Sequence, residues 1–105
     1  MTALQITTTA QAESTRIVLA GELDIATAPQ LEQALEPLLA QGNGDLHLDM
    51  RGVTFLDSSG LRVVLVASRT ATTAGRRLVV DPGEGQVLRV IRLARVEDRL
   101  DLGDG

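Results

Sequence analysis

The chain has 105 residues, with ten basic and fourteen acidic side chains and one histidine, and a formal net charge of −4. This length suffices for one compact domain over residues 1–105 and is too short for two. Hydrophobic residues make up 44% of the chain, which is typical of a globular protein and argues against disorder. Because no cysteine is present, disulfides, cysteine-ligated metals and thiol nucleophiles are excluded.

The side chains on which most enzyme chemistry depends are scarce. All ten basic residues are arginines, so a lysine Schiff base and a Walker-type phosphate lysine are excluded. His47 is the single histidine and lies in a predicted strand, where we interpret it as a solvated side chain and not as a ligand or base. We therefore expect no catalytic residues, no metal site and no cofactor.

Composition also bears on nucleic acids and membranes. The chain is acidic, and Phe55 is its single aromatic residue. Since proteins bind nucleic acid through basic patches and stacking aromatic rings, a nucleic-acid-binding function is not expected. The longest apolar run, 63–67, is far below the roughly 20 residues of a membrane span. The first residues resemble no signal peptide. These observations predict a cytoplasmic protein that binds neither nucleic acid nor membrane.

Alternating and β-branched segments predict the strands. Residues 4–9 alternate with a period of two, and the β-branched segment 16–20 follows a short polar turn, so the two form a hairpin. Further strands are predicted over 45–50 and 77–80, and a short edge strand at 100–102 is left open.

Helical spacing of apolar residues predicts three helices, over 28–41, 59–74 and 85–96. Thr27 is the expected N-cap of the first, and Pro37 should kink its last turn or end it early. Two glycines stand where left-handed C-terminal caps belong, after the first and second helices: Gly42 and Gly75.

The resulting order, β-β-α-β-α-β-α, predicts an α/β fold with a mixed sheet of four to five strands that opens with a hairpin. In strand 45–50, Leu46, Leu48 and Met50 alternate with Asp45, His47 and Asp49. Since a strand covered on both faces would be apolar on both, we expect the helices to pack mainly on one face.

Residues 57–61 carry the chemistry: an acid and two hydroxyls at the start of an apolar helix. Asp57, Ser58 and Ser59 are all good N-cap types, and capping alone would explain them. A serine nucleophile would need a base, and the Gly-x-Ser-x-Gly pattern is absent. A phosphoryl group at a helix N-terminus, in contrast, is tolerated by the helix dipole and would alter an interface more than the fold.

The segment 55–61, the upstream Gly21–Asp24 loop and the apolar pattern of 87–93 resemble those of STAS-domain anti-sigma factor antagonists, over essentially the whole chain. The resemblance implies the STAS fold. It also implies bacterial partner switching: the unphosphorylated protein captures an anti-sigma factor and releases sigma, and phosphorylation ends the capture.

The resemblance implies the roles of individual residues. Ser58 corresponds to the phosphoacceptor, with Ser59 as the second choice, and Gly60 leaves room for a partner at the helix start. Helical spacing places the outer helix face opposite the apolar one. The partner-binding residues are then predicted to be Asp24, Asp57, Ser58, Ser59, Gly60, Arg62, Val66 and Arg69.

The implied partners are an anti-sigma factor that is itself a serine kinase and a metal-dependent serine phosphatase, with a monomer as the free form. Arg62 departs from the family pattern, since many relatives have a small residue there, and it is either a phosphate or partner contact or a solvated helix arginine. The alternative function is a STAS scaffold or ligand-binding module, in lipid-transport accessory proteins or stress-sensing assemblies, without regulation by phosphorylation. An esterase-like enzyme is the third choice.

Overall fold

The computed structural model describes residues 3–103. The elements follow the predicted order, with a short 3-10 turn and a final two-residue strand added. They are β1 (Gln5–Ala10), β2 (Ser14–Leu23), α1 (Ala28–Ala40), β3 (Asp45–Leu56), α2 (Ser58–Thr73), β4 (Leu78–Asp81), α3 (Gln86–Ala94), η1 (Glu97–Arg99) and β5 (Asp101–Leu102).

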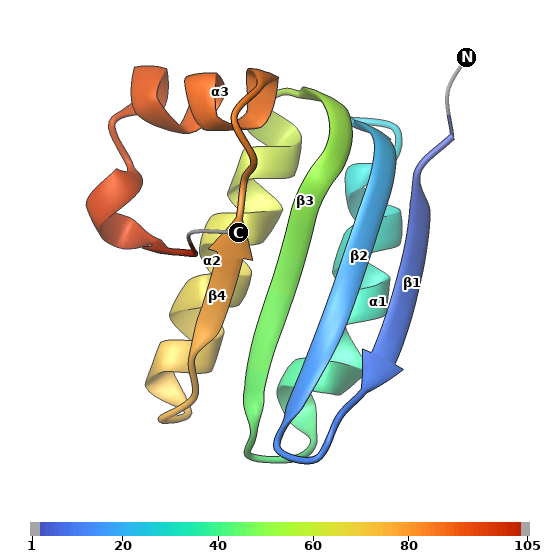
Figure 1. The fold of residues 1–105 in the computed structure, drawn as a ribbon, viewed down its shortest axis with the longest axis vertical. Coiled ribbons are helices and arrows are strands. Elements are labelled where there is room, and N and C mark those ends of the chain that lie inside the picture. Colours follow the sequence, from blue (N-terminus) through green and yellow to red (C-terminus); the bar gives the residue numbers. More distant parts are fainter. Residues whose placement is uncertain (1–2, 104–105) are drawn as a thin grey trace.

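The five strands form one mixed sheet in the order β1-β2-β3-β4-β5 (Figure 1). β1 and β2 pair antiparallel, as the predicted hairpin requires. The remaining neighbours pair parallel. Because parallel strands end at the same edge, the loops that follow β2, β3 and β4 lie together at the carboxyl edge of the sheet.

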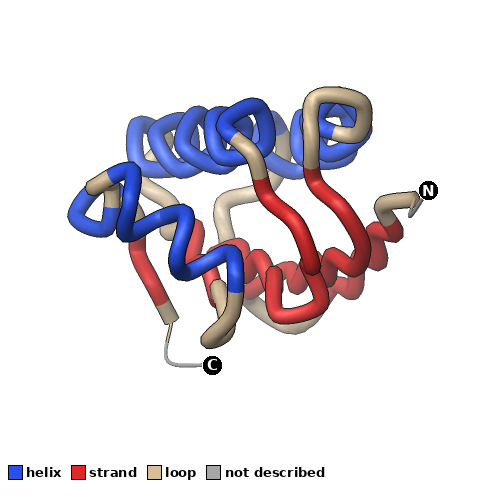
Figure 2. Tube along the Cα trace, turned by 90° about the horizontal axis from the view of Figure 1, so that it is seen from above, coloured by secondary structure: helices blue, strands red, loops and turns tan. Residues whose placement is uncertain are grey.

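The helices cover one face of the sheet, as predicted. Figure 2 shows two long helices together on one side of the strands, and Figure 1 identifies them as α1 and α2, behind the sheet. The third helix, α3, packs against β3 and lies across the carboxyl end of the sheet. None of the helices within residues 3–103 combines the length and the hydrophobicity needed to cross a bilayer.

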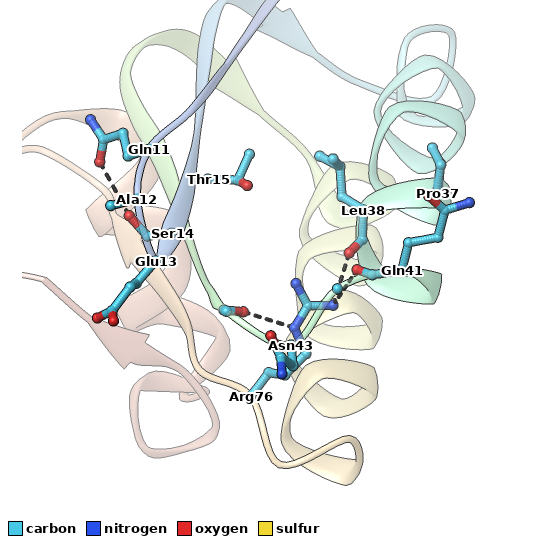
Figure 3. Close-up of a pocket in the computed structure, with 12 residues that line it drawn as sticks. Gln11, Ala12, Glu13, Ser14, Thr15, Pro37, Leu38, Gln41, Asn43 and Arg76 are labelled. Atoms are coloured by element: carbon cyan, nitrogen blue, oxygen red, sulfur yellow. Dashed lines mark hydrogen bonds between the residues drawn. The ribbon is translucent and has the colours of Figure 1, made fainter.

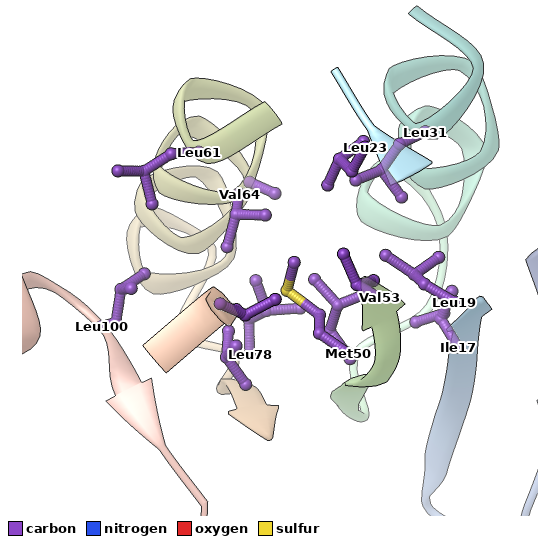
Figure 4. Close-up of a cluster of buried hydrophobic side chains, with 14 of the residues drawn as sticks. Ile17, Leu19, Leu23, Leu31, Met50, Val53, Leu61, Val64, Leu78 and Leu100 are labelled. Atoms are coloured by element: carbon purple, nitrogen blue, oxygen red, sulfur yellow. The ribbon is translucent and has the colours of Figure 1, made fainter. Parts of the chain in front are cut away.

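The core lies between the sheet and these two helices and is almost wholly aliphatic (Figure 4). Leu46, Leu48 and Met50 of β3 point into it, as their alternation predicts. They meet leucines of α1 and the Leu61 and Val64 side chains of α2. Full burial of one such side chain contributes roughly 1.5–3 kcal/mol, so this layer supplies most of the stability.

The opposite sheet face, which α1 and α2 leave uncovered, carries a charge cluster that the sequence analysis did not predict. His47 is half-buried, but the Asp49 side chain is only 7% exposed. Its Oδ2 accepts hydrogen bonds from Arg16 at 2.6 Å and Arg51 at 2.8 Å. These bonds, those of Arg51 foremost, hold the pKa of Asp49 far below its usual range.

β2 and β3 are longer than predicted, because their parallel pairing continues beyond the apolar segments of 16–20 and 45–50. The pairing shifts register between Val18 and Ala20, where Gly52 stands opposite Ala20. A Cβ at Gly52 would lie 2.9 Å from the Leu19 carbonyl oxygen, so only glycine allows this approach. The strands therefore extend to the carboxyl edge through a sequence that does not read as a strand.

Two predictions about the end of α1 have different outcomes. Gly42 takes φ +77°, which confirms the left-handed backbone predicted after α1. The early end predicted at Pro37 is wrong, because the helix continues to Ala40 and the N–H of Gln41 still donates to the Pro37 carbonyl. Proline removes its own donor, but its carbonyl still serves the last turn.

The helix following β4 is shorter than the predicted 85–96. It ends at Ala94 because Arg95 turns into the left-handed region, with φ +58°. Gly75 shows the same turn after α2, with φ +73°, as predicted. Because this position holds an arginine and not the usual glycine, the sequence pattern does not predict where the helix ends.

Candidate functional site

The candidate site lies where β2 and β3 end side by side at the carboxyl edge. β2 leads into the loop of Asp24 and Ile25, which precedes α1, and β3 leads through Asp57 into Ser58, the first residue of α2. Since the two strands are paired up to Leu23 and Leu56, the two loops are neighbours. The fold thus brings together two segments that are more than thirty residues apart.

Asp57 is the N-cap of α2. Its Oδ1 accepts hydrogen bonds from the backbone N–H groups of Ser59 at 2.9 Å and Gly60 at 3.1 Å. Its Oδ2 accepts one from the N–H of Ile25 at 3.2 Å, in the loop before α1. One carboxylate therefore caps the helix and joins the two loops. We infer that the main role of Asp57 is to stabilise the fold.

Ser58 is exposed and Ser59 is half-buried. The helix begins at Ser58, one residue before the predicted start at Ser59, because the cap is the preceding aspartate. Since Asp57 does the capping, the hydroxyl of Ser58 is not required for it. The capping interpretation is thus confirmed for Asp57, and Ser58 presents its hydroxyl to solvent at the mouth of the helix.

Asp24 organises its own loop. Its Oδ1 accepts hydrogen bonds from the backbone N–H groups of Ala26 at 2.9 Å and Thr27 at 3.1 Å. Thr27 is the N-cap residue of α1, as predicted, but its side chain makes no cap hydrogen bond and its hydroxyl donates to the Glu22 carbonyl at 2.8 Å. The side chain of Asp24 thus holds the turn before α1, and its backbone carbonyl accepts from the N–H of Ala28, the first residue of the helix, at 2.7 Å.

The role predicted for Gly60, to leave room for a partner, is wrong. Gly60 is buried, and a Cβ there would lie 2.6 Å from Leu23 Cγ and 2.8 Å from Leu56 Cδ1. The missing side chain makes room for the ends of the two strands, inside the protein. Gly60 therefore belongs to the packing beneath the site and not to its surface.

The exposed part of the site is a groove of about 530 Å³ between the first turns of α1 and α2. Ser58, Arg62 and Val66 line one wall, and Ile25 and Pro29 line the other. Two of the apolar side chains are unusually open to solvent, Ile25 at 76% and Val66 at 50%. Exposed apolar residues beside polar ones indicate a protein-binding surface.

Two residues predicted to bind a partner lie on the exposed face of α2 in or beside this groove. Arg62 stands four residues after Ser58, so both side chains lie on the same helix face. Arg69 lies two turns further along α2 and is exposed. The structure thus places Arg62, Val66 and Arg69 on the outer face of α2, as their spacing predicts.

Gln86, the first residue of α3, supports the site and was missed in the sequence analysis. Its Oε1 accepts a hydrogen bond from the backbone N–H of Leu56 at 2.7 Å, and its Nε2 donates to the Leu56 carbonyl at 3.2 Å. The side chain thereby replaces a neighbouring strand at the end of β3. No local pattern marks a glutamine for such a distant contact.

A second hollow, of about 450 Å³, lies at the opposite edge of the sheet and has a structural explanation (Figure 3). Arg76 is buried there, and its guanidinium donates to the carbonyls of Leu38 at 2.8 Å and Gly44 at 2.8 Å. It also donates to the Leu39 and Gln41 carbonyls. These acceptors include backbone carbonyls that have no partner within α1, so the Arg76 side chain caps the C-terminus of that helix.

His47 lies too far from Ser58 to act as its base in hydrolytic chemistry. His47 precedes Leu56 by nine residues in the same strand, which separates them by roughly 30 Å at about 3.3 Å per residue. Nucleophilic catalysis requires a base within hydrogen-bond reach.

Comparison with known proteins defines the class. A family model described as "Mlab, STAS domain" matches residues 6–103. The chain therefore belongs to the STAS domain family. The anti-sigma-B factor antagonist of Staphylococcus aureus is 26% identical over 102 residues, which are 97% of this chain and 94% of that protein.

Solved structures share the fold. An anti-sigma factor antagonist from Mycobacterium paratuberculosis matches with a TM-score of 0.81 at 24% identity, over 98% of this chain and 87% of that one. The antagonist SpoIIAA in its unphosphorylated form matches with a TM-score of 0.76 at 22% identity, over 96% of this chain and 88% of that one. Phosphorylated SpoIIAA of Bacillus matches at 0.71 and 22%, over 96% and 91%. The mixed sheet with helices on one face is thus the STAS fold, as the sequence predicted.

Proposed function

We propose that this protein is an anti-sigma factor antagonist whose binding is controlled by phosphorylation of Ser58. The unphosphorylated form binds an anti-sigma factor that is a serine kinase and thereby releases sigma. The observation that carries the proposal is the division of roles at α2: Asp57 caps the helix and Ser58 is exposed. The names of the similar proteins support it.

The phosphoryl group comes from ATP bound to the kinase. A bond forms between Ser58 Oγ and the γ-phosphorus, the bond from that phosphorus to the bridging oxygen breaks, and ADP leaves. The hydroxyl proton goes to a base of the kinase. A metal-dependent phosphatase reverses the step by hydrolysis. In this scheme the protein is a substrate and binding partner and not an enzyme, and it is monomeric when free.

The charge added to Ser58 explains the control of binding. A phosphate adds about 1.5 to 2 negative charges. The N–H groups of Ser59 and Gly60 already bond to Asp57, so they are not free to neutralise it. Arg62, one turn along, is the nearest candidate cation on α2. A partner covering the groove would then bury an anion beside the Asp57 carboxylate, which opposes binding.

The test uses the purified protein with the ATP-binding anti-sigma candidate encoded beside it. Intact mass should rise by about 80 Da, the mass of one phosphoryl group, in wild type and in Ser59→Ala but not in Ser58→Ala. By calorimetry, Ser58→Asp should bind that partner about 100-fold more weakly, or about 2.7 kcal/mol. Its melting temperature should remain close to that of wild type.

Two results would contradict the proposal. Modification of Ser58→Ala, with loss of modification in Ser59→Ala, would move the acceptor to Ser59. Absence of both binding and modification in wild type would favour the scaffold or ligand-binding alternative. In that case a transporter ATPase or a stress-sensing assembly is the partner to seek in pull-downs.

A further inference from the structure

We propose that the groove beside Ser58 continues between α1 and α2 as far as Ala40 and Thr70 and receives an amphipathic helix of the anti-sigma partner. This inference rests on the proposed function and specifies the element by which the partner binds. It extends the contact surface along α1, where the sequence analysis predicted no partner-binding residue.

The groove continues directly from the Ser58 site. Another hollow, of about 380 Å³, lies further along α1 and α2. It shares Glu32, Val63 and Val66 with the hollow that contains Ser58. The rest of its lining comes from both helices: Leu35, Glu36, Leu39, Ala40, Ala67 and Thr70. Figures 1 and 2 show α1 and α2 side by side on the same face of the sheet.

The dimensions suit a helix. Both α1 and α2 begin at the carboxyl edge of the sheet, so they run in the same direction with one groove between them. From Ser58 to Thr70 the groove spans twelve residues of α2, or about 18 Å at 1.5 Å per residue. A partner helix of about twelve residues would fill it.

The floor of the groove is apolar and incompletely covered. Leu39 and Val63 are partly buried, and Val66 is half exposed. A helix that places apolar side chains at positions i, i+3 and i+7 would complete this burial, which is the usual way an amphipathic helix binds a groove. Burial of one such side chain is sufficient for a measurable change in affinity.

The two rims carry opposite charge. Glu32 and Glu36 line the groove from α1, Arg62 lines it from α2, and all three are exposed. Arg69 is exposed on the outer face of α2, beside the groove and not in its lining. Within residues 3–103, none of these four side chains takes part in an ion pair. A complementary helix would have basic residues toward α1 and acidic residues toward α2.

This charge pattern argues for a protein helix over other occupants. An anionic lipid surface attracts uniformly basic faces and would be repelled by the acidic rim of α1. A second copy of this chain could offer α3, whose exposed Arg89 and Arg92 match the rim of α1. Those arginines leave the basic rim of α2 without acidic partners, so a two-sided partner helix fits better.

The test is the affinity of single variants for the anti-sigma partner, by calorimetry. Glu36→Arg and Val66→Asp change lining residues of the groove, and Arg69→Glu changes the exposed face of α2 beside it. Each should weaken binding at least tenfold. Glu13→Arg and Arg89→Glu are matched changes at exposed sites outside the groove and should stay within twofold. Because each changed side chain is exposed, the melting temperatures should differ little from that of wild type. The milder Glu36→Gln and Arg69→Gln replace any variant that unfolds.

The outcomes separate the two proposals. Groove variants that bind like wild type, while Ser58→Asp loses affinity, would overturn the groove assignment and leave the proposed function standing. Equal losses in the control variants would show a general charge effect and overturn it too. A wild-type protein that does not bind the kinase at all would overturn the proposed function and this inference with it.

Discussion

The carboxylate of Asp57 accepts a hydrogen bond at 3.2 Å from the backbone N–H of Ile25, 32 residues earlier in the chain. The same side chain caps α2 through its other oxygen. One residue thus joins the loops on both sides of the groove and leaves the neighbouring Ser58 hydroxyl exposed. This relationship separates the group that stabilises the fold from the group proposed to be modified.

Replacement of the cap should reveal this separation. Asp57→Ala is expected to lower the free energy of unfolding by about 1–2 kcal/mol, because the cap is lost and the Ile25 N–H loses its partner. Asp57→Asn should lose less, since its amide oxygen still accepts the cap hydrogen bonds. Urea denaturation measures these values. Ser58→Ala is the matched control and should stay within about 0.5 kcal/mol. An equal loss in Ser58→Ala would show that the serine also stabilises the helix start.

Asp49 should make the free energy of unfolding depend on pH in the acidic range. Because Arg51 and Arg16 lower its pKa in the folded protein, folding stabilises the ionised form. Its contribution is complete above the unfolded-state pKa of about 3.9 and is lost as pH falls below that value toward the lower folded-state pKa.

Urea denaturation between pH 7 and pH 2 tests this contribution. Asp49→Asn should be less stable than wild type by about 1–3 kcal/mol at pH 7, and this difference should shrink as pH falls below about 4. Asp98→Asn, at an exposed position, is the control. A difference that is independent of pH would assign the effect to packing and not to the charge.

Gly60 should be intolerant of any side chain. Gly60→Ala is expected to destabilise by about 1–3 kcal/mol or more, because the Cβ would lie within 3 Å of Leu23 and Leu56, including the Leu23 carbonyl oxygen. Gly85→Ala is the matched control, since a Cβ there meets nothing within 4 Å. Thermal melts of both variants decide the matter. If Gly60→Ala were as stable as Gly85→Ala, the ends of β2 and β3 would be able to shift and accommodate the Cβ, and Gly60 would have another role.

Arg95 offers a stabilising change. Its left-handed backbone, with φ +58°, costs a residue with a side chain roughly 1 kcal/mol relative to glycine. Arg95→Gly should therefore raise the melting temperature by several degrees, given about 4–8 °C per kcal/mol for a chain of this size. Arg92→Gly, inside the helix, should lower it instead. A decrease in both variants would show that the Arg95 side chain makes a compensating contact.

The sequence was sufficient where a local pattern sets the structure. Alternation in 45–50 and the spacing of Leu61 and Val64 predict which faces are buried, and the glycines after α1 and α2 predict where the chain turns. The outer face of α2, with Arg62, Val66 and Arg69, follows from the same spacing. The family resemblance then made the start of α2 the candidate site, and that assignment stays a proposal.

What could not be predicted depends on contacts between distant segments. The extension of β3 through Gly52 requires β2 beside it, and the burial of Asp49 requires Arg16 from another strand. The closed surroundings of Gly60 come from the ends of two strands, and Gln86 reaches Leu56 across thirty residues. Helix periodicity is local, whereas each of these features is a pairing that no single segment encodes.

The exposed position of Ser58 also bears on how long each form of the protein would survive in a cell. Proteases cleave mainly the transiently opened chain, whose population follows the free energy of unfolding. A modification that leaves this energy nearly unchanged leaves degradation nearly unchanged as well. The ratio of the two forms would then report the opposing activities of kinase and phosphatase, with no contribution from selective turnover.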